Sequence, residues 1–160
     1  MDTNSNLGRH FLDTNCALRA SGPGKRATTM QSSNQGLPID QPRSGRELQL
    51  VHIAHAFLKN ASVNPRDCDI HLEISETADK TAPRVVLETP VDSEYCSARQ
   101  NIQGKLKQHG FRLDVEHGGE LFSPLGVSVL GLPFEDFEHA RGSPQVATLW
   151  EIHPAIVNIL

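Results

Sequence analysis

The chain has 160 residues, of which 38% are hydrophobic and 5% aromatic, and its formal net charge at pH 7 is -4. This length favours one domain with a sizeable core, whereas the acidic balance and the few aromatic residues argue against a nucleic-acid-binding face. The sequence shows neither an apolar run of about 18 residues, as a membrane-spanning helix requires, nor the apolar centre of a secretory signal. We therefore expect no membrane association, with the cytoplasm as the default compartment and export left open.

Residues 1–45 are rich in Ser, Asn, Gly, Gln, Pro and Thr and show no sustained hydrophobic period. A segment of this composition buries too little apolar surface to offset the entropy that ordering removes. It is predicted to be a disordered tail or linker, although its few apolar residues leave open a short helix or a docking peptide. The predicted folded domain covers residues 46–160.

The three cysteines, Cys16, Cys68 and Cys96, lie far apart and form no C-x-x-C pair. This spacing predicts neither a disulfide framework nor a thiolate zinc site. Because the count is odd, at least one thiol is expected to be free.

Three strands are predicted at the start of the folded part. Residues 47–59 alternate weakly, and the break in their alternation indicates a bulged strand or, alternatively, an amphipathic helix. Residues 69–75 alternate cleanly, with acidic and histidine side chains opposite the aliphatic ones. Residues 83–90 form the third strand, which ends at Pro90 because proline cannot donate to a sheet ladder.

A helix is predicted between Asp92, which can cap it, and Gly110, which can end it, because apolar side chains recur between them at spacings of three and four. Its basic residues Arg99, Lys105 and Lys107 are interpreted as a solvated face, with favourable charges near the C-terminal end of the helix.

Residues 111–117, a Gly-Gly turn and a strand over 125–136 follow the helix, and Gly131 indicates a bulge in that strand. A last strand covers residues 148–160. The order of elements predicts a mainly β fold: a five-stranded OB-like Greek-key barrel with one helix between strands 3 and 4. An α+β sandwich with one helix is the alternative. On the last strand, Trp150 is predicted to lie in the core, with base or sugar stacking as the alternative.

Candidate site residues come from separate strands and loops. They are Asp69, His71, Glu88, Asp136, His139, Glu151 and His153. Asp69 and His71 are spaced by two, as are Glu151 and His153, so each pair shares one face of its strand. If the two strands are neighbours, four ionisable groups converge.

Imidazoles and carboxylates are ligands of zinc and related divalent ions, so these residues form a candidate metal site. A structural network of hydrogen-bonded histidines and carboxylates is the favoured interpretation, and an acid-base catalytic pair is the third. The sequence contains no H-E-x-x-H, no Walker loop, no G-x-G-x-x-G and no nucleophile elbow.

The segments DCDIHLEIS, APRVVLETP, GVSVLGLPFEDFEHA and TLWEIHPAIVNIL together resemble a family of small, uncharacterised bacterial proteins with D-x-H-L and W-E-I-H-P motifs. The resemblance covers residues 46–160. It implies an OB-like fold and a recurrence of the seven polar positions as one cluster, and it carries no activity. Members of the family are often exported, which the polar N-terminus does not support.

The sequence therefore favours a non-enzymatic binding or interaction module for a small ligand or a protein, with a His/carboxylate cluster that is a candidate divalent metal site. One alternative is a metal-dependent hydrolase, such as a nuclease, in which a bound ion activates water. Another is a barrel that binds single-stranded nucleic acid or an oligosaccharide, of which nucleic acid is disfavoured by the net charge. No membrane partner is expected.

Overall fold

The computed structural model describes residues 43–136 and 144–160, so the predicted tail up to residue 42 lies outside the described residues. The described elements are a short 3-10 helix η2 (Gly45–Leu48), strands β1 (Val51–Val63), β2 (Ile70–Ser75) and β3 (Arg84–Thr89), the 3-10 turn η3 (Ser93–Tyr95), helix α2 (Cys96–Gln108), and strands β4 (Gly119–Glu135) and β5 (Val146–Ile159).

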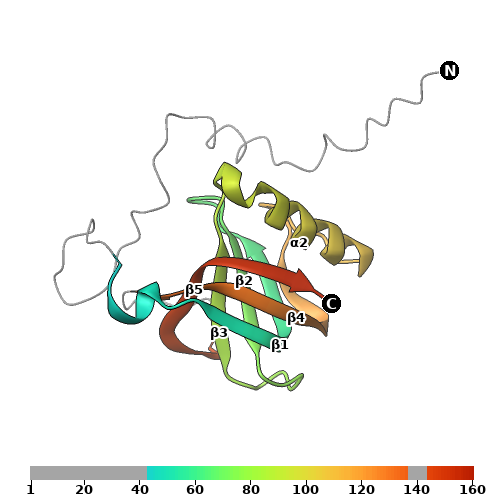
Figure 1. Cartoon of the computed structure of the whole chain (residues 1–160). Helices are drawn as coiled ribbons and strands as arrows, with labels where there is room; N and C mark the ends of the chain where they lie inside the picture. The colour runs from blue at the N-terminus through green and yellow to red at the C-terminus, as the bar shows by residue number, and fades with distance from the viewer. Residues whose placement is uncertain (1–42, 137–143) are drawn as a thin grey trace.

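The five strands close into one barrel in the order β1-β2-β3-β5-β4. Neighbouring strands are antiparallel except for β3 and β5, which run parallel. A parallel pair needs a long crossover, and α2 and β4 provide it. Helix α2 lies across one end of the barrel (Figure 1). The structure confirms a mainly β, five-stranded barrel with one helix between the third and fourth strands, and the sandwich alternative is wrong.

Some element boundaries differ from the expected ones. β4 begins at Gly119, inside the predicted Gly-Gly turn, where the positive φ of 121° suits glycine. Residues 111–117 contain no strand. Asp92 precedes η3, and its side chain makes no capping hydrogen bond. The helical segment starts with this 3-10 turn and continues as α2. No helix within the described ranges is long and apolar enough to cross a membrane.

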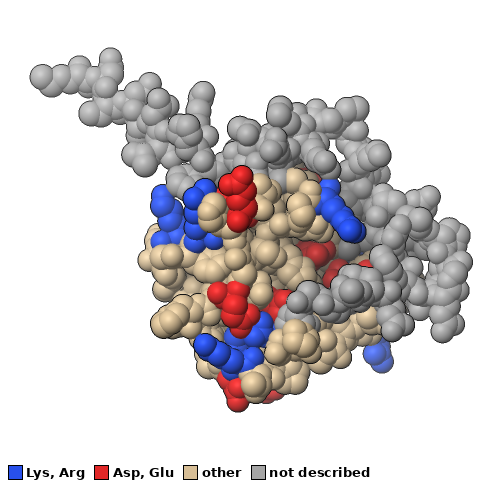
Figure 2. Space-filling view, turned by 180° about the vertical axis from the view of Figure 1, so that it is seen from behind, with Lys and Arg blue, Asp and Glu red and all other residues tan. Residues whose placement is uncertain are grey.

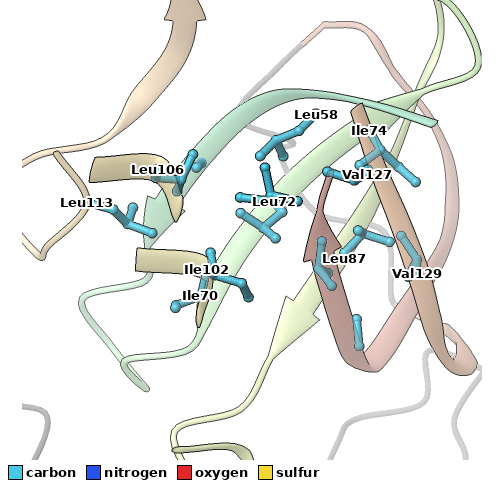
Figure 3. Packing of buried hydrophobic residues seen from close by; sticks show 14 of the residues in the cluster. Leu58, Ile70, Leu72, Ile74, Leu87, Ile102, Leu106, Leu113, Val127 and Val129 are labelled. Carbon is cyan, nitrogen blue, oxygen red and sulfur yellow. The ribbon is translucent and has the colours of Figure 1, made fainter. Parts of the chain in front are cut away.

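The core fills the barrel with aliphatic side chains from alternating strand positions. From the strands it contains Ala56, Leu58, Ala61, Val63, Ile70, Leu72, Ile74, Leu121, Val127, Val129, Leu87, Ile152, Ala155, Val157 and Ile159. Helix α2 adds Ile102 and Leu106, and Figure 3 shows Ile102 beside Ile70. The helix therefore covers one end of the barrel and contributes to its core. Trp150 is half-buried and lies outside this cluster of core residues.

Arg99 corrects the expectation of a solvated basic face on the helix. It is buried, and its Nη1 and Nη2 donate to the carbonyls of Thr89 and Cys68 at 2.9 and 2.8 Å. The two carbonyls lie at the last residue of β3 and just before β2, where the pairing of these strands ends. A guanidinium has several N–H donors and can therefore bind both carbonyls. Cys96 is a free thiol, whereas Cys68 is disulfide-bonded, which the cysteine spacing did not predict.

A bulge interrupts the pairing of β4 with β5. Gly131 pairs with Ala155 and Pro133 pairs with Ile152, so a step of two residues on β4 faces a step of three on β5. The irregularity lies next to Gly131, as the sequence predicted, but the additional residue belongs to β5. An additional residue reverses the alternation of a strand, so Ile152 points into the core before the bulge, and Ala155 and Val157 do so after it.

Replacing Gly131 with alanine is expected to lower the free energy of unfolding by about 2 kcal/mol. A Cβ at this position would lie well inside van der Waals contact of the Pro154 carbonyl oxygen and the Ile152 side chain. Gly104 is the matched control, because a Cβ there meets nothing and Gly104→Ala should stabilise the helix by up to about 1 kcal/mol. Urea denaturation measures both changes, and equal midpoints for Gly131→Ala and the wild type would contradict the close approach.

Candidate functional site

The outer wall of the barrel over β2, β3 and β5 carries the candidate residues. β2 pairs with β3 so that His71 faces Glu88, and the parallel pairing of β3 with β5 places Leu87 beside Ile152. Leu87 and Ile152 point into the core. Because side chains alternate along a strand, the residues that follow them, Glu88 and His153, point outward together.

Glu88 lies between the two histidines. Its Oε1 is 3.3 Å from Nδ1 of His71, and its Oε2 is 2.9 Å from Nδ1 of His153. Glu151 adds a second carboxylate to His153, with Oε1 at 3.9 Å from Nδ1. One carboxylate therefore joins an imidazole of β2 to an imidazole of β5 across the outer face of β3.

Asp69 completes the cluster from the loop that leads into β2. Its Oδ2 lies 3.6 Å from Nε2 of His153, and its Oδ1 accepts a hydrogen bond from the backbone N–H of Val91 at 2.9 Å. Asp69, Glu88 and His153 each offer one ligand atom, and these three atoms lie within 4.8 Å of one another. This spacing is compact enough for a metal site.

The imidazole of His153 is buried without a well-directed hydrogen bond. His153 is 4% exposed, and neither ring nitrogen makes a hydrogen bond of acceptable geometry, despite the short distances to carboxylates. A buried polar group without a hydrogen bond carries a substantial free-energy cost. A metal ion bound in place of a ring proton would satisfy a nitrogen that the protein leaves without a well-directed hydrogen bond.

The cluster continues into a charged network that sequence reasoning did not select. Nε2 of His71 is 3.9 Å from Oε1 of Glu73, and Nη1 of Arg84 donates to Oε2 of Glu73 at 3.1 Å. Arg84 also holds both oxygens of Glu120, at 2.6 and 2.7 Å. Alternation could have found two of these residues, because Glu73 follows His71 by two positions and Arg84 precedes Glu88 by four.

Carboxylates raise the pKa of both histidines. Burial alone would lower the pKa of His153, but the carboxylates of Glu151 and Glu88 outweigh it and raise the pKa to about 9. Burial likewise opposes the shift at His71, where Glu73 and Glu88 raise the pKa to about 9. Without a metal ion, both imidazoles are therefore cationic at neutral pH.

The carboxyl groups shift in different directions. Burial raises the pKa of Asp69 to about 7, although the charge of His153 opposes it, and burial also raises the pKa of Glu151. At Glu88, burial opposes ionisation, but His153 and His71 lower the pKa to about 2. Glu88 is thus the permanent anion of the cluster, whereas Asp69 titrates near neutrality.

Five of the seven predicted positions lie together in this cluster, namely Asp69, His71, Glu88, Glu151 and His153. Asp136 lies at the end of β4, where its backbone N–H donates to the Leu149 carbonyl at 2.9 Å, and its charge contributes to the raised pKa of Glu151. It does not belong to the compact group of three ligands. His139 lies outside the described residues.

Basic and acidic side chains are interspersed on the described surface in Figure 2. This face therefore presents no continuous basic patch among the described residues, of the kind that phosphate backbones require.

Comparisons with protein-family models, curated proteins and solved structures found no match to this chain. The resemblance to a bacterial family with D-x-H-L and W-E-I-H-P motifs therefore stays a prediction.

Proposed function

We propose that the protein is a binding module whose barrel wall holds one divalent metal ion on Asp69, Glu88 and His153. The observation that carries the proposal is the buried imidazole of His153, which lies between two carboxylates with neither ring nitrogen properly hydrogen-bonded. A cluster of carboxylates alone does not indicate a metal site. The buried imidazole of His153, which faces two carboxylates, supports one.

The donor set favours zinc. One imidazole and two carboxylates are common zinc ligands, whereas sites for magnesium or calcium use oxygen donors alone. His71 contacts the remaining oxygen of Glu88, as residues behind a metal ligand commonly do to fix its orientation.

The burial of the ligands supports a structural site over a hydrolytic one. Asp69 and His153 are 8% and 4% exposed, so a substrate would have little access to the position that three protein ligands leave open on a tetrahedral ion. The three ligands come from β3, β5 and the loop before β2. A bound ion would therefore join three segments that are distant in the sequence.

The test measures metal content and affinity in wild type, His153→Ala and His52→Ala. We expect about one zinc ion per wild-type chain by elemental mass spectrometry, and its loss in His153→Ala because an essential ligand is missing. His52 is the matched control, since it is an exposed strand histidine, and His52→Ala should retain the ion. Chelation should lower the melting temperature of the wild type and of His52→Ala, but not that of His153→Ala.

Two outcomes would contradict the proposal. Wild-type protein that takes up no divalent ion, with a melting temperature indifferent to chelator, would leave the cluster as a structural network of ion pairs. Metal-dependent hydrolysis of a phosphodiester by the wild type, but not by His153→Ala, would show that the site is catalytic and not structural.

A further inference from the structure

The bulge between β4 and β5 interrupts the regular pairing of the two strands next to His153. The ladder is irregular between the Gly131–Ala155 pair and the Pro133–Ile152 pair, and His153 lies inside the irregular stretch. Bulges locally disrupt ladder hydrogen bonds, so the backbone of His153 needs another support. The ligand of the proposed centre therefore lies in an irregular part of its strand.

Arg43 provides that support from outside the barrel. Its Nη1 donates to the carbonyl of Pro133 at 2.9 Å, and its Nη2 donates to the carbonyl of His153. Its guanidinium also lies over the ring of Phe134, 5.4 Å from the centroid. The planar guanidinium of Arg43 thus links β4 to β5 across the bulge. Arginine suits this position because its N–H donors are fixed relative to one another.

The backbone beside Arg43 is itself held in place. The N–H of Ser44 donates to Oε2 of Glu47 at 3.2 Å, as one half of a capping box at the start of η2. Glu47 is buried. Arg43 therefore reaches the bulge from a fixed turn.

We propose that Arg43 is a positioning residue for the metal centre. By holding the carbonyl of His153, it fixes the backbone from which the imidazole reaches Asp69 and Glu88, and it makes metal affinity depend on the segment that precedes β1. This inference rests on the proposed function. Residues that orient metal ligands typically change affinity by about 10- to 100-fold when they are replaced.

The experiment measures the zinc dissociation constant by competition with a chromophoric chelator in wild type, Arg43→Ala, Arg43→Lys and Arg46→Ala. We expect about 10- to 100-fold weaker binding by Arg43→Ala. Arg43→Lys should bind zinc with intermediate affinity, because an ammonium group lacks the two fixed N–H donors with which the planar guanidinium holds both carbonyls. Arg46 is the matched control, since it is an exposed arginine three residues away, and Arg46→Ala should bind as the wild type does.

Melting temperatures in excess chelator report the folding of each variant separately from its zinc affinity. A weakened Arg43→Ala whose metal-free melting temperature stays near that of the wild type supports positioning. If the wild type binds zinc and the affinity of Arg43→Ala is within twofold of the wild-type affinity, this inference alone is overturned. A wild type that binds no zinc overturns the proposed function and this inference together.

Discussion

Replacing Glu88 with alanine is expected to abolish zinc binding. It should also lower the free energy of unfolding of the metal-free protein by about 3 kcal/mol at pH 6. Glu88 is the carboxylate that both His71 and His153 contact, at 3.3 and 2.9 Å. Its removal leaves two largely buried cations without their shared counter-ion, and breaking such a pair costs more than the intact pair contributes. Urea denaturation in chelator measures the stability change, and calorimetric titration measures binding.

The effect of Glu88→Ala should depend on pH in a defined direction. The pKa of Glu88 is lowered to about 2 and those of both histidines are raised to about 9, so the loss should be largest between about pH 5 and 8 and smaller above pH 9. Glu116→Ala is the control, because Glu116 is exposed. A loss of the same size at pH 6 and pH 10 would show that packing, and not charge, explains the effect.

Alternation along the strands was sufficient to predict most of the candidate cluster. In β2 and β5, polar side chains two positions apart must share a face, and that face is outward because the intervening leucines and isoleucines fill the core. The order of elements predicted the barrel. These patterns predicted that Asp69 and His71 meet Glu151 and His153 if their strands are neighbours. The strands are not neighbours, because β3 lies between them, and the groups converge because Glu88 of β3 contacts both histidines.

Other parts of the site depend on features that a local pattern does not carry. The alternation of β5 reverses at the bulge after Ile152, and nothing in a period-two pattern indicates where an additional residue is absorbed. Glu120 reaches Arg84 across the barrel wall from β4, and Arg43 precedes the predicted domain boundary. Such contacts follow from the closure of the barrel, so they require the three-dimensional structure.

The charge balance of the cluster distinguishes an ion-pair network from a metal centre. With both histidines protonated, His71 and His153 offset the charges of nearby carboxylates such as Glu88 and Glu73. A divalent ion would displace the proton of His153, because only the neutral imidazole is a ligand. The two states therefore compete for the same ring, and the pH sets which one prevails.

This competition predicts that the metal-free protein loses stability as the pH rises from about 6.5 to 9. The pKa of His153 is raised from 6.5 to about 9, so its contribution is fully present below pH 6.5 and is lost as the pH rises through 9, on the order of 3 kcal/mol. His71 shifts in the same direction. The pKa of Asp69 is raised to about 7, so its contribution to stability is lost as the pH rises through 7 and is absent well above that pH.

Zinc should oppose this trend, because deprotonation of His153 removes the proton that competes with the ion. The stabilisation by zinc, measured as the difference in melting temperature between saturating zinc and chelator, should therefore grow from pH 6 to pH 8.5. His153→Ala serves as the control, since it lacks both the titrating ring and the ligand, and its melting temperature should respond less to pH and not at all to zinc. A metal-free melting temperature that stays constant from pH 6.5 to 9 would contradict the raised histidine pKa values. A constant zinc effect over the same range would contradict His153 as a ligand.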